Sequence, residues 1–210
     1  CPSHPYDHSP SLIEYLSKEE NYLLVFLHYK GTWESGGVCN LENSVESVID
    51  VYNYLKKGAV EDILRDEVIT LNLTKVTLIG ASFGGGVALV SSAKLNVKSV
   101  IALAPVIDFK NHNNQGFEEN LDQTFLKINL GWKNLWRFTE SDWNKLKNGL
   151  LDLNPIEYID KFEDTQFLLV HGKEDKSVDY KKNVNFVKKI NKTSTNKADI
   201  LLCENQGHFG

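Results

Sequence analysis

A serine lies between glycines in residues 80–84, which read Gly-Ala-Ser-Phe-Gly. A short apolar run precedes this segment at 76–79, and small or apolar residues follow it at 85–90. This order predicts a strand, a sharp turn and a helix, and such a turn pushes the Ser82 hydroxyl out of the sheet. A bare G-x-S-x-G often arises by chance, but the predicted strand and helix around it make Ser82 a candidate nucleophile.

A serine hydroxyl needs a base to take its proton and an acid to orient that base. Asp175 follows a predicted buried strand at 166–170, and His208 follows a predicted strand at 198–203. Because the carboxyl ends of parallel strands meet at one edge of a sheet, we expect Ser82, Asp175 and His208 to converge there. We therefore predict a catalytic triad in which Ser82 is the nucleophile, Asp175 the orienting acid and His208 the base.

Other acidic residues compete with Asp175 for the orienting role. Glu174 is one residue early, and Asp108 follows another predicted strand. Asp179 is better explained as the N-cap of the helix predicted at 179–190. Each candidate taken singly also has an ordinary structural explanation, and only the three residues together, in this order, predict a catalytic triad.

Predicted strands alternate with helices along the chain. The near-continuous apolar run at 22–29 is typical of a strand whose two faces are both covered by helices. The alternation predicts an α/β fold with a parallel sheet and right-handed crossovers. We expect helices at 11–20, 43–57 and 179–190, and strands at 22–29, 75–80, 97–104, 166–170 and 198–203.

Residues 106–150 differ in character, because they are rich in asparagine and aromatic residues. We expect a small helical cap here, with helices around 118–128 and 140–150. Two roles for the aromatic side chains stay open. They either line an apolar pocket over Ser82 or pack the insertion onto the sheet, and packing is favoured for most of them.

These motifs resemble the α/β-hydrolase superfamily, and within it the catalytic domain of prolyl oligopeptidase-type enzymes and related small esterases. The resemblance covers most of the chain outside 106–150. It implies an α/β-hydrolase fold, with a mostly parallel sheet and helices on both faces, in one domain over residues 1–210. The segments that carry it are 80–85, 154–159, His171-Gly172-x-x-Asp175, 207–208 and 29–37, the last resembling the loop before the helix that precedes the elbow strand.

The same resemblance bears on the ends of the chain. The superfamily usually has about three further strands before its oxyanion loop and a closing helix after the catalytic histidine. We therefore expect residues 1–210 to lack N-terminal strands and a C-terminal helix.

The resemblance also implies two N–H donors for the developing oxyanion. The first is the backbone N–H of Phe83, the residue after the nucleophile. The second is assigned to the loop at 4–8, where Pro5 has no N–H, so Tyr6 is preferred through its backbone or its hydroxyl. An alternative for this loop is a metal site with His4, Asp7 and His8 as ligands. No second cluster completes such a site, so we expect neither metal nor cofactor.

The amino-acid composition limits which classes of partner and which compartment are expected. The formal net charge of −5 and the lack of a concentrated basic stripe argue against nucleic acid. No apolar run approaches the roughly 20 residues of a membrane helix, so no membrane association is expected. Three widely spaced cysteines favour a reducing compartment, which predicts a cytoplasmic protein.

The sequence therefore predicts a serine hydrolase that cleaves an ester, an amide or a short peptide through an acyl-enzyme. One alternative is a prolyl oligopeptidase-type peptidase, although such enzymes usually carry a β-propeller that is not seen in this sequence. The other is a non-catalytic ligand-binding protein of the same fold, although such proteins typically lose a triad member. No pattern indicates an oligomeric state.

Overall fold

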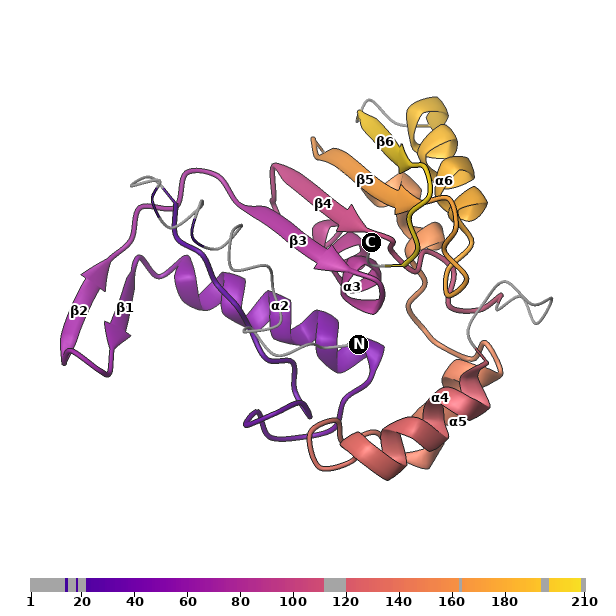
Figure 1. Cartoon of the computed structure of the whole chain (residues 1–210). Helices are drawn as coiled ribbons and strands as arrows, with labels where there is room; N and C mark the ends of the chain where they lie inside the picture. The colour runs from indigo at the N-terminus through magenta and orange to yellow at the C-terminus, as the bar shows by residue number, and fades with distance from the viewer. Residues whose placement is uncertain are drawn as a thin grey trace.

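Four parallel strands form the central sheet, and they lie side by side in chain order, β3-β4-β5-β6 (Figure 1). The computed structural model describes residues 14, 18, 22–111, 120–162, 164–193 and 197–208. Because successive strands are parallel neighbours, all four carboxyl ends lie at the same edge of the sheet. The strands are β3 (Thr77–Ala81), β4 (Ser99–Leu103), β5 (Gln166–Gly172) and β6 (Ala198–Cys203).

Helices fill the connections between the strands. A two-stranded antiparallel hairpin, β1 (Ala59–Asp62) and β2 (Glu67–Thr70), separates the first helix from β3 and extends away from the sheet (Figure 1). Between β4 and β5 the chain forms the two-helix segment drawn in salmon in Figure 1. The helical elements are α2 (Leu41–Leu55), α3 (Phe83–Ser92), α4 (Leu121–Lys127), the π-helical turn η2 (Ile128–Trp132), α5 (Glu140–Lys147), the 3₁₀ helix η3 (Pro155–Lys161) and α6 (Tyr180–Thr193).

The core lies on one face of the sheet. Alternate residues of the strands point to this face, so Val100 and Leu169 are completely buried. Leu89 of α3 and Phe186 of α6 pack in the same cluster, so both helices cover this face. Full burial of such a side chain stabilises the fold by about 1.5–3 kcal/mol. This layer fixes the position of the strand ends that carry the candidate site.

The opposite face of the sheet is exposed among the described residues. The outward residues at neighbouring register positions keep substantial exposure, which reaches 54% at Ile79, 39% at Leu168 and 56% at Leu201. The helices described in contact with the sheet, α3 and α6, belong to the other layer. The helices expected on this second face are therefore not among the described elements.

Most predicted elements are confirmed within a few residues. The four strands from 75 onwards and the helices at 43–57, 118–128, 140–150 and 179–190 correspond to β3–β6 and to α2, α4, α5 and α6. The helix predicted at 11–20 lies outside the described residues, apart from Glu14 and Lys18. These two form an exposed ion pair at 2.7 Å.

The strand predicted at 22–29 is wrong. Residues 22–29 are described without strand pairing, so the sheet has four described strands and not five. Leu27 and Tyr29 still pack against the core, whereas Tyr22 and Phe26 are largely exposed. Apolar character alone does not form a strand, because a strand also needs a neighbour that accepts its hydrogen bonds.

The described helices include none that is both long and apolar enough to cross a bilayer.

Candidate active site

Ser82 occupies the sharp turn between β3 and α3, and its backbone is strained. Its φ of 52° and ψ of −117° lie outside the regions that residues with a side chain prefer. A Cβ atom on Gly80 would lie 2.2 Å from the carbonyl oxygen of Gly84, so only glycine fits there. The Ser82 N–H donates to the carbonyl of Leu103 at 2.8 Å, which ties the turn to the end of β4. The elbow predicted from the sequence is therefore present, with its strain held by neighbouring backbone.

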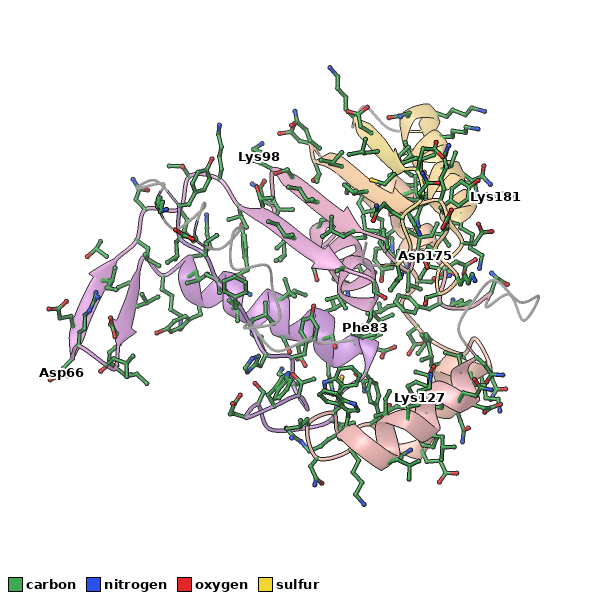
Figure 2. The ribbon with its side chains drawn as sticks, viewed as in Figure 1. Asp66, Phe83, Lys98, Lys127, Asp175 and Lys181 are labelled. Carbon is green, nitrogen blue, oxygen red and sulfur yellow. The ribbon has the colours of Figure 1, made fainter. Side chains whose placement is uncertain are left out.

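Phe83 begins α3, where a helix leaves N–H groups without intrahelical partners and where its dipole favours negative charge. Figure 2 shows Phe83 at this end of the helix. Its ring packs edge-on against Tyr29 and Phe109, with centroids 6.3 Å and 5.9 Å away. Burial raises the pKa of the Tyr29 hydroxyl. The backbone of Phe83 is thus fixed by aromatic packing next to the elbow.

Asp175 lies in the loop after β5 (Figure 2), and its carboxylate is completely buried. Its Oδ1 atom accepts from the backbone N–H groups of Ser177 at 2.7 Å and Val178 at 3.0 Å. Its Oδ2 atom accepts from Nδ1 of His208 at 2.7 Å and from Nε2 of His171 at 2.9 Å. Four donors therefore hold one carboxylate in a single orientation.

The electrostatics of Asp175 follow from these contacts. Burial opposes the charged form of a carboxyl group, but the hydrogen bonds from His171 and His208 outweigh burial. The backbone N–H of Val178 adds to them. Together they hold the pKa of Asp175 well below its usual range, so the group is ionised at neutral pH.

His208 reaches Asp175 because two loops are bonded to each other. The chain after β6 runs back across the carboxyl ends of the neighbouring strands (Figure 1). The N–H of Lys173 donates to the carbonyl of Cys203 at 3.0 Å, and that of Glu174 donates to Gln206 at 2.9 Å. The His208 side chain keeps 17% exposure while the Asp175 side chain has none. A buried Asp175 and a partly exposed His208 suit proton transfer between His208 and a substrate.

The competing acids have other partners. Asp108 accepts hydrogen bonds from the side chains of Asn154 and Asn111. Burial acts against ionisation of Asp108, but these hydrogen bonds hold its pKa below the usual range. Asp179 accepts from the N–H of Lys181 at 2.9 Å, as expected of a residue at the start of α6. Asp175 is the carboxylate that is hydrogen-bonded to His208.

Some predicted site residues lie outside the described residues. Tyr6, the expected second oxyanion donor, is one of them. The alternative metal ligands are the others: His4, Asp7 and His8. Within the part of the chain that is described, no group of three or more His, Cys, Asp or Glu side chains is arranged to hold a metal ion.

The sequence interpretation missed the role of two polar residues beside the site. The sequence singles out His171 only as part of the His171-Gly172-x-x-Asp175 segment, yet it shares Asp175 with His208. Asn183 was not considered, although its side chain contacts His171. A signal was present in α6, because Asn183 takes a position on the buried face that Phe186, Val187 and Ile190 also occupy. A polar residue on an apolar helix face needs a buried partner.

The aromatic residues of the insertion pack mainly on one another. Trp136 and Trp143 are buried in a separate small cluster with Ile128. Phe125 and Phe138 contact Trp143, with ring centroids 5.2 Å and 5.5 Å away. The packing expected from the sequence is therefore found, mostly within the two-helix segment, whereas Phe109 packs in the main core cluster.

This segment is bonded to the loop that precedes α2. The N–H of Trp33 donates to Leu135 and that of Cys39 donates to Arg137, at 2.8 Å and 2.9 Å. The Arg137 guanidinium also donates to the carbonyls of Trp33 and Ser35. The loop and the segment thus form one hydrogen-bonded unit.

Solved structures of hydrolases share this fold. Est1E from Butyrivibrio proteoclasticus superposes with a TM-score of 0.54 at 19% identity, over 81% of this chain and 63% of that protein. The Pyrococcus furiosus esterase Pf2001 gives 0.65 at 15% identity, over 97% of this chain and 69% of its own. A puromycin-hydrolyzing peptidase of Mycobacterium tuberculosis gives 0.52 at 16% identity, over 78% of this chain and 22% of its own. At these low sequence identities, the superpositions show a common fold and no more.

The chain spans 63% of the length of Est1E, the first of these structures. A comparison with curated protein sequences finds no significant match. The sequence pattern of the prolyl oligopeptidase family matches residues 9–210, so this chain belongs to the prolyl oligopeptidase family.

Proposed function

We propose that this protein is a serine hydrolase that cleaves an ester or amide bond of a small substrate through an acyl-enzyme. One observation carries the proposal. The imidazole of His208 is hydrogen-bonded at 2.7 Å to the buried carboxylate of Asp175, at the same sheet edge as the strained Ser82 turn. Membership of the prolyl oligopeptidase family and the shared hydrolase fold support it.

In the proposed reaction, the Ser82 oxygen attacks the substrate carbonyl carbon while its proton passes to Nε2 of His208. The new C–O bond pushes the carbonyl electron pair onto oxygen, where the Phe83 N–H and a second donor from Tyr6 stabilise the charge. Collapse of this intermediate breaks the bond to the leaving group, which takes the proton from His208. Water then repeats the cycle on the acyl-enzyme and releases the acid. Asp175 stays ionised and keeps the Nδ1 proton of His208 in place.

The two-helix segment between β4 and β5 is proposed to act as a cap over this edge. Its own aromatic cluster and its hydrogen bonds to the loop before α2 hold it together as a unit, and Leu146 of α5 also packs against the main core. Such a cap controls which acyl groups reach the nucleophile. Ester and peptide substrates both fit the chemistry. The proteins of similar fold include an esterase and a peptidase, so both classes belong in the test.

Covalent labelling with a fluorophosphonate probe tests the proposal, because this probe reacts with activated serines. We expect labelling of the folded protein at Ser82 and none in Ser82→Ala. The matched control is Ser91→Ala, which changes a buried serine on α3 and is expected to keep the label. Intact protein that takes up no label would support the alternative of a non-catalytic binding protein.

A substrate panel then separates the two hydrolase classes. p-Nitrophenyl esters of increasing acyl length are compared with aminoacyl amides and short peptides. Turnover of the esters alone identifies an esterase, whereas comparable kcat/KM on the amides identifies a peptidase. Loss of both activities in Ser82→Ala shows that a single site is responsible.

A further inference from the structure

Two buried polar side chains follow one another from Asp175: His171 contacts its Oδ2 atom, and Asn183 contacts His171. His171 in β5 is 1% exposed, and Asn183 in α6 is completely buried. Buried polar groups are costly unless each is hydrogen-bonded. The partners of these two residues therefore determine which of their atoms carry hydrogens.

The amide of Asn183 has a defined orientation. Its Nδ2 atom lies 3.1 Å from the carbonyl oxygen of Pro105, which can only accept, so the group that faces Pro105 is the NH₂. The same NH₂ lies 2.8 Å from Nδ1 of His171. The opposite orientation would place two oxygens against each other at Pro105. The Nδ1 atom of His171 is therefore an acceptor and carries no proton.

The other ring nitrogen of His171 must then carry the proton. Nε2 lies 2.9 Å from Oδ2 of Asp175 and 3.2 Å from the carbonyl oxygen of Val178, and both of these atoms accept. The Nε2–H tautomer satisfies every contact of the ring. In the Nδ1–H tautomer a lone pair would face the Asp175 carboxylate and an N–H would face the Asn183 NH₂. Two contacts would become repulsive in a buried place.

We propose that Asn183 and His171 are positioning residues for the hydrolytic reaction: Asn183 holds His171 in the Nε2–H tautomer, and His171 then holds Asp175 Oδ2 against Nδ1 of His208. This inference rests on the proposed function of His208 as the base. In this proposal both residues act through Asp175. Among the described residues, Asp175 is the titratable group hydrogen-bonded to His171; His208 shares its Oδ2 atom, and the Tyr180 ring lies 6.5 Å from His171 on α6.

The tautomer can be measured without any activity. Long-range ¹H–¹⁵N correlation spectra of the histidine-labelled protein distinguish Nδ1–H from Nε2–H rings, and His171→Gln assigns the signal. We expect His171 of the intact protein to show a protonated Nε2 and an unprotonated Nδ1 at neutral pH. A protonated Nδ1 on His171 would overturn the proposal.

Asn183→Asp tests the consequence for catalysis. The new carboxylate replaces the donor with an acceptor of the same shape, so Nδ1 of His171 gains a proton. We expect kcat to fall by about tenfold or more, the scale of losing an outer partner of a site residue, with KM nearly unchanged. Rescue gives a second readout. His171→Gln keeps an amide donor towards Asp175 and is expected to retain more of kcat than His171→Leu.

The matched control is Asn154→Asp, the same substitution at a second buried asparagine, which is 1% exposed. Asn154 bonds to Asp108 and to the backbone of Phe109, so its loss should lower stability while kcat and the His171 tautomer stay as they are. Equal losses of kcat in the two aspartate variants would show a merely structural role.

The His171 tautomer tests this inference, and the labelling of Ser82 tests the proposed function, so the two can fail separately. A correct tautomer without labelling removes the hydrolase proposal, and labelling with the opposite tautomer removes only this inference. Should Asn183→Asp fail to fold, the spectrum of the unaltered protein still decides.

Discussion

The backbone N–H of Glu174 donates to the carbonyl of Gln206 at 2.9 Å, which joins the loop after β5 to the loop after β6. This bond lies one residue from Asp175 and two residues from His208. It explains how an acid and a base that are 33 positions apart meet at 2.7 Å. The approach of the two loops depends on a residue without a side chain, because a Cβ atom on Gly172 would lie 2.2 Å from the Gln206 carbonyl oxygen.

Gly172→Ala should therefore push the loop of His208 away from Asp175. No rotamer can relieve the clash, because the atoms that the new Cβ meets are backbone atoms of Gln206 and Gly207. We expect kcat towards the best ester or amide to fall by about a hundredfold or more, since small displacements of a catalytic group are costly. Steady-state kinetics and thermal unfolding measure the two effects.

Gly207→Ala is the control in the same loop. A Cβ at Gly207 meets no described atom within 4 Å, so this variant should keep most of its kcat. Equal activity losses in the two variants would mean that the loop is sensitive to any added side chain and that the close approach at Gly172 has no special role.

Asp175→Asn should reduce both catalysis and stability. An uncharged amide oxygen accepts hydrogen bonds from the two imidazoles more weakly than a carboxylate oxygen does. In a comparable triad, the loss of this carboxylate lowers kcat by about ten-thousandfold. Asp108→Asn is the control, because Asp108 bonds to Asn154 and Asn111. We expect that variant to keep its kcat. If Asp108→Asn caused the larger loss, the acid would be misassigned.

The stability effect of Asp175 should depend on pH in a defined direction. Its pKa in the folded protein lies below the ordinary 3.8, so the folded state favours the ionised form. The stabilisation is present above that ordinary value and is lost as the pH falls through the lower folded value. The gap in unfolding free energy between the unaltered protein and Asp175→Asn should therefore be widest at neutral pH and narrow below about pH 4. A gap that grows towards acid would contradict this assignment. Urea titrations across this range measure it.

Local signals in the sequence explain why the elbow was predicted correctly. A strand, a Gly-Ala-Ser-Phe-Gly turn and a helix are contiguous, so Ser82 needed no long-range information. The meeting of Asp175 and His208 followed from one rule of parallel sheets, because both residues come directly after strands. The orientation of Asn183 could not be predicted in this way. It depends on Pro105, in the segment after β4, and on His171 in β5, which are far from Asn183 in the sequence.

Two elements show where sequence patterns mislead. Residues 22–29 have strand composition, but no described strand pairs with them. The hairpin of β1 and β2 was missed because its turn lacks the usual Asn-Gly or Asp-Gly pair. Asp66 takes the left-handed conformation there with a φ of 54°, and the Asp62 carboxylate accepts from the N–H groups of Leu64 and Arg65. The Asp62 side chain and the left-handed Asp66 thus form this turn without a glycine.

The cysteines should differ in reactivity. Cys39 is completely buried, and burial raises the pKa of its thiol from 9.0 to about 12, so thiolate forms only with difficulty. Cys203 at the end of β6 is partly exposed. In a Cys1→Ser background, we expect a thiol reagent to modify Cys203 in the native protein and Cys39 only after unfolding. Mass spectrometry of digests identifies the site, and rapid native labelling of Cys39 would contradict its burial.

Cys39 also predicts a loss of stability in alkali. Its thiol pKa is raised on folding, so the stabilisation is complete below pH 9.0 and is lost as the pH rises towards about 12. Cys39→Ala removes this titration and should flatten the stability profile above about pH 9, although the smaller side chain costs some stability at every pH. Parallel profiles for the two proteins would show that another group is responsible for alkaline unfolding.

The strain at Ser82 predicts a trade-off between stability and activity. A side chain at a φ of 52° and a ψ of −117° costs on the order of 1–3 kcal/mol, whereas glycine adopts this conformation freely. Glycine also loses about 0.5–1 kcal/mol more entropy than alanine on folding, so relief of strain should be the larger effect. We expect Ser82→Gly to be more stable than Ser82→Ala by on the order of 1 kcal/mol, with both variants inactive.

The same pair of substitutions at Ser91 supplies the control. Ser91 lies in the last turn of α3 and not at a strained turn, so Ser91→Gly should be less stable than Ser91→Ala by up to about 0.5–1 kcal/mol. The order of glycine and alanine thus reverses between two serines of neighbouring elements. Chemical denaturation of the four variants decides, and glycine as the less stable variant at both positions would show that the Ser82 turn stores no strain. A reversed order would mean that the fold maintains an unfavourable backbone at the one serine proposed to attack the substrate.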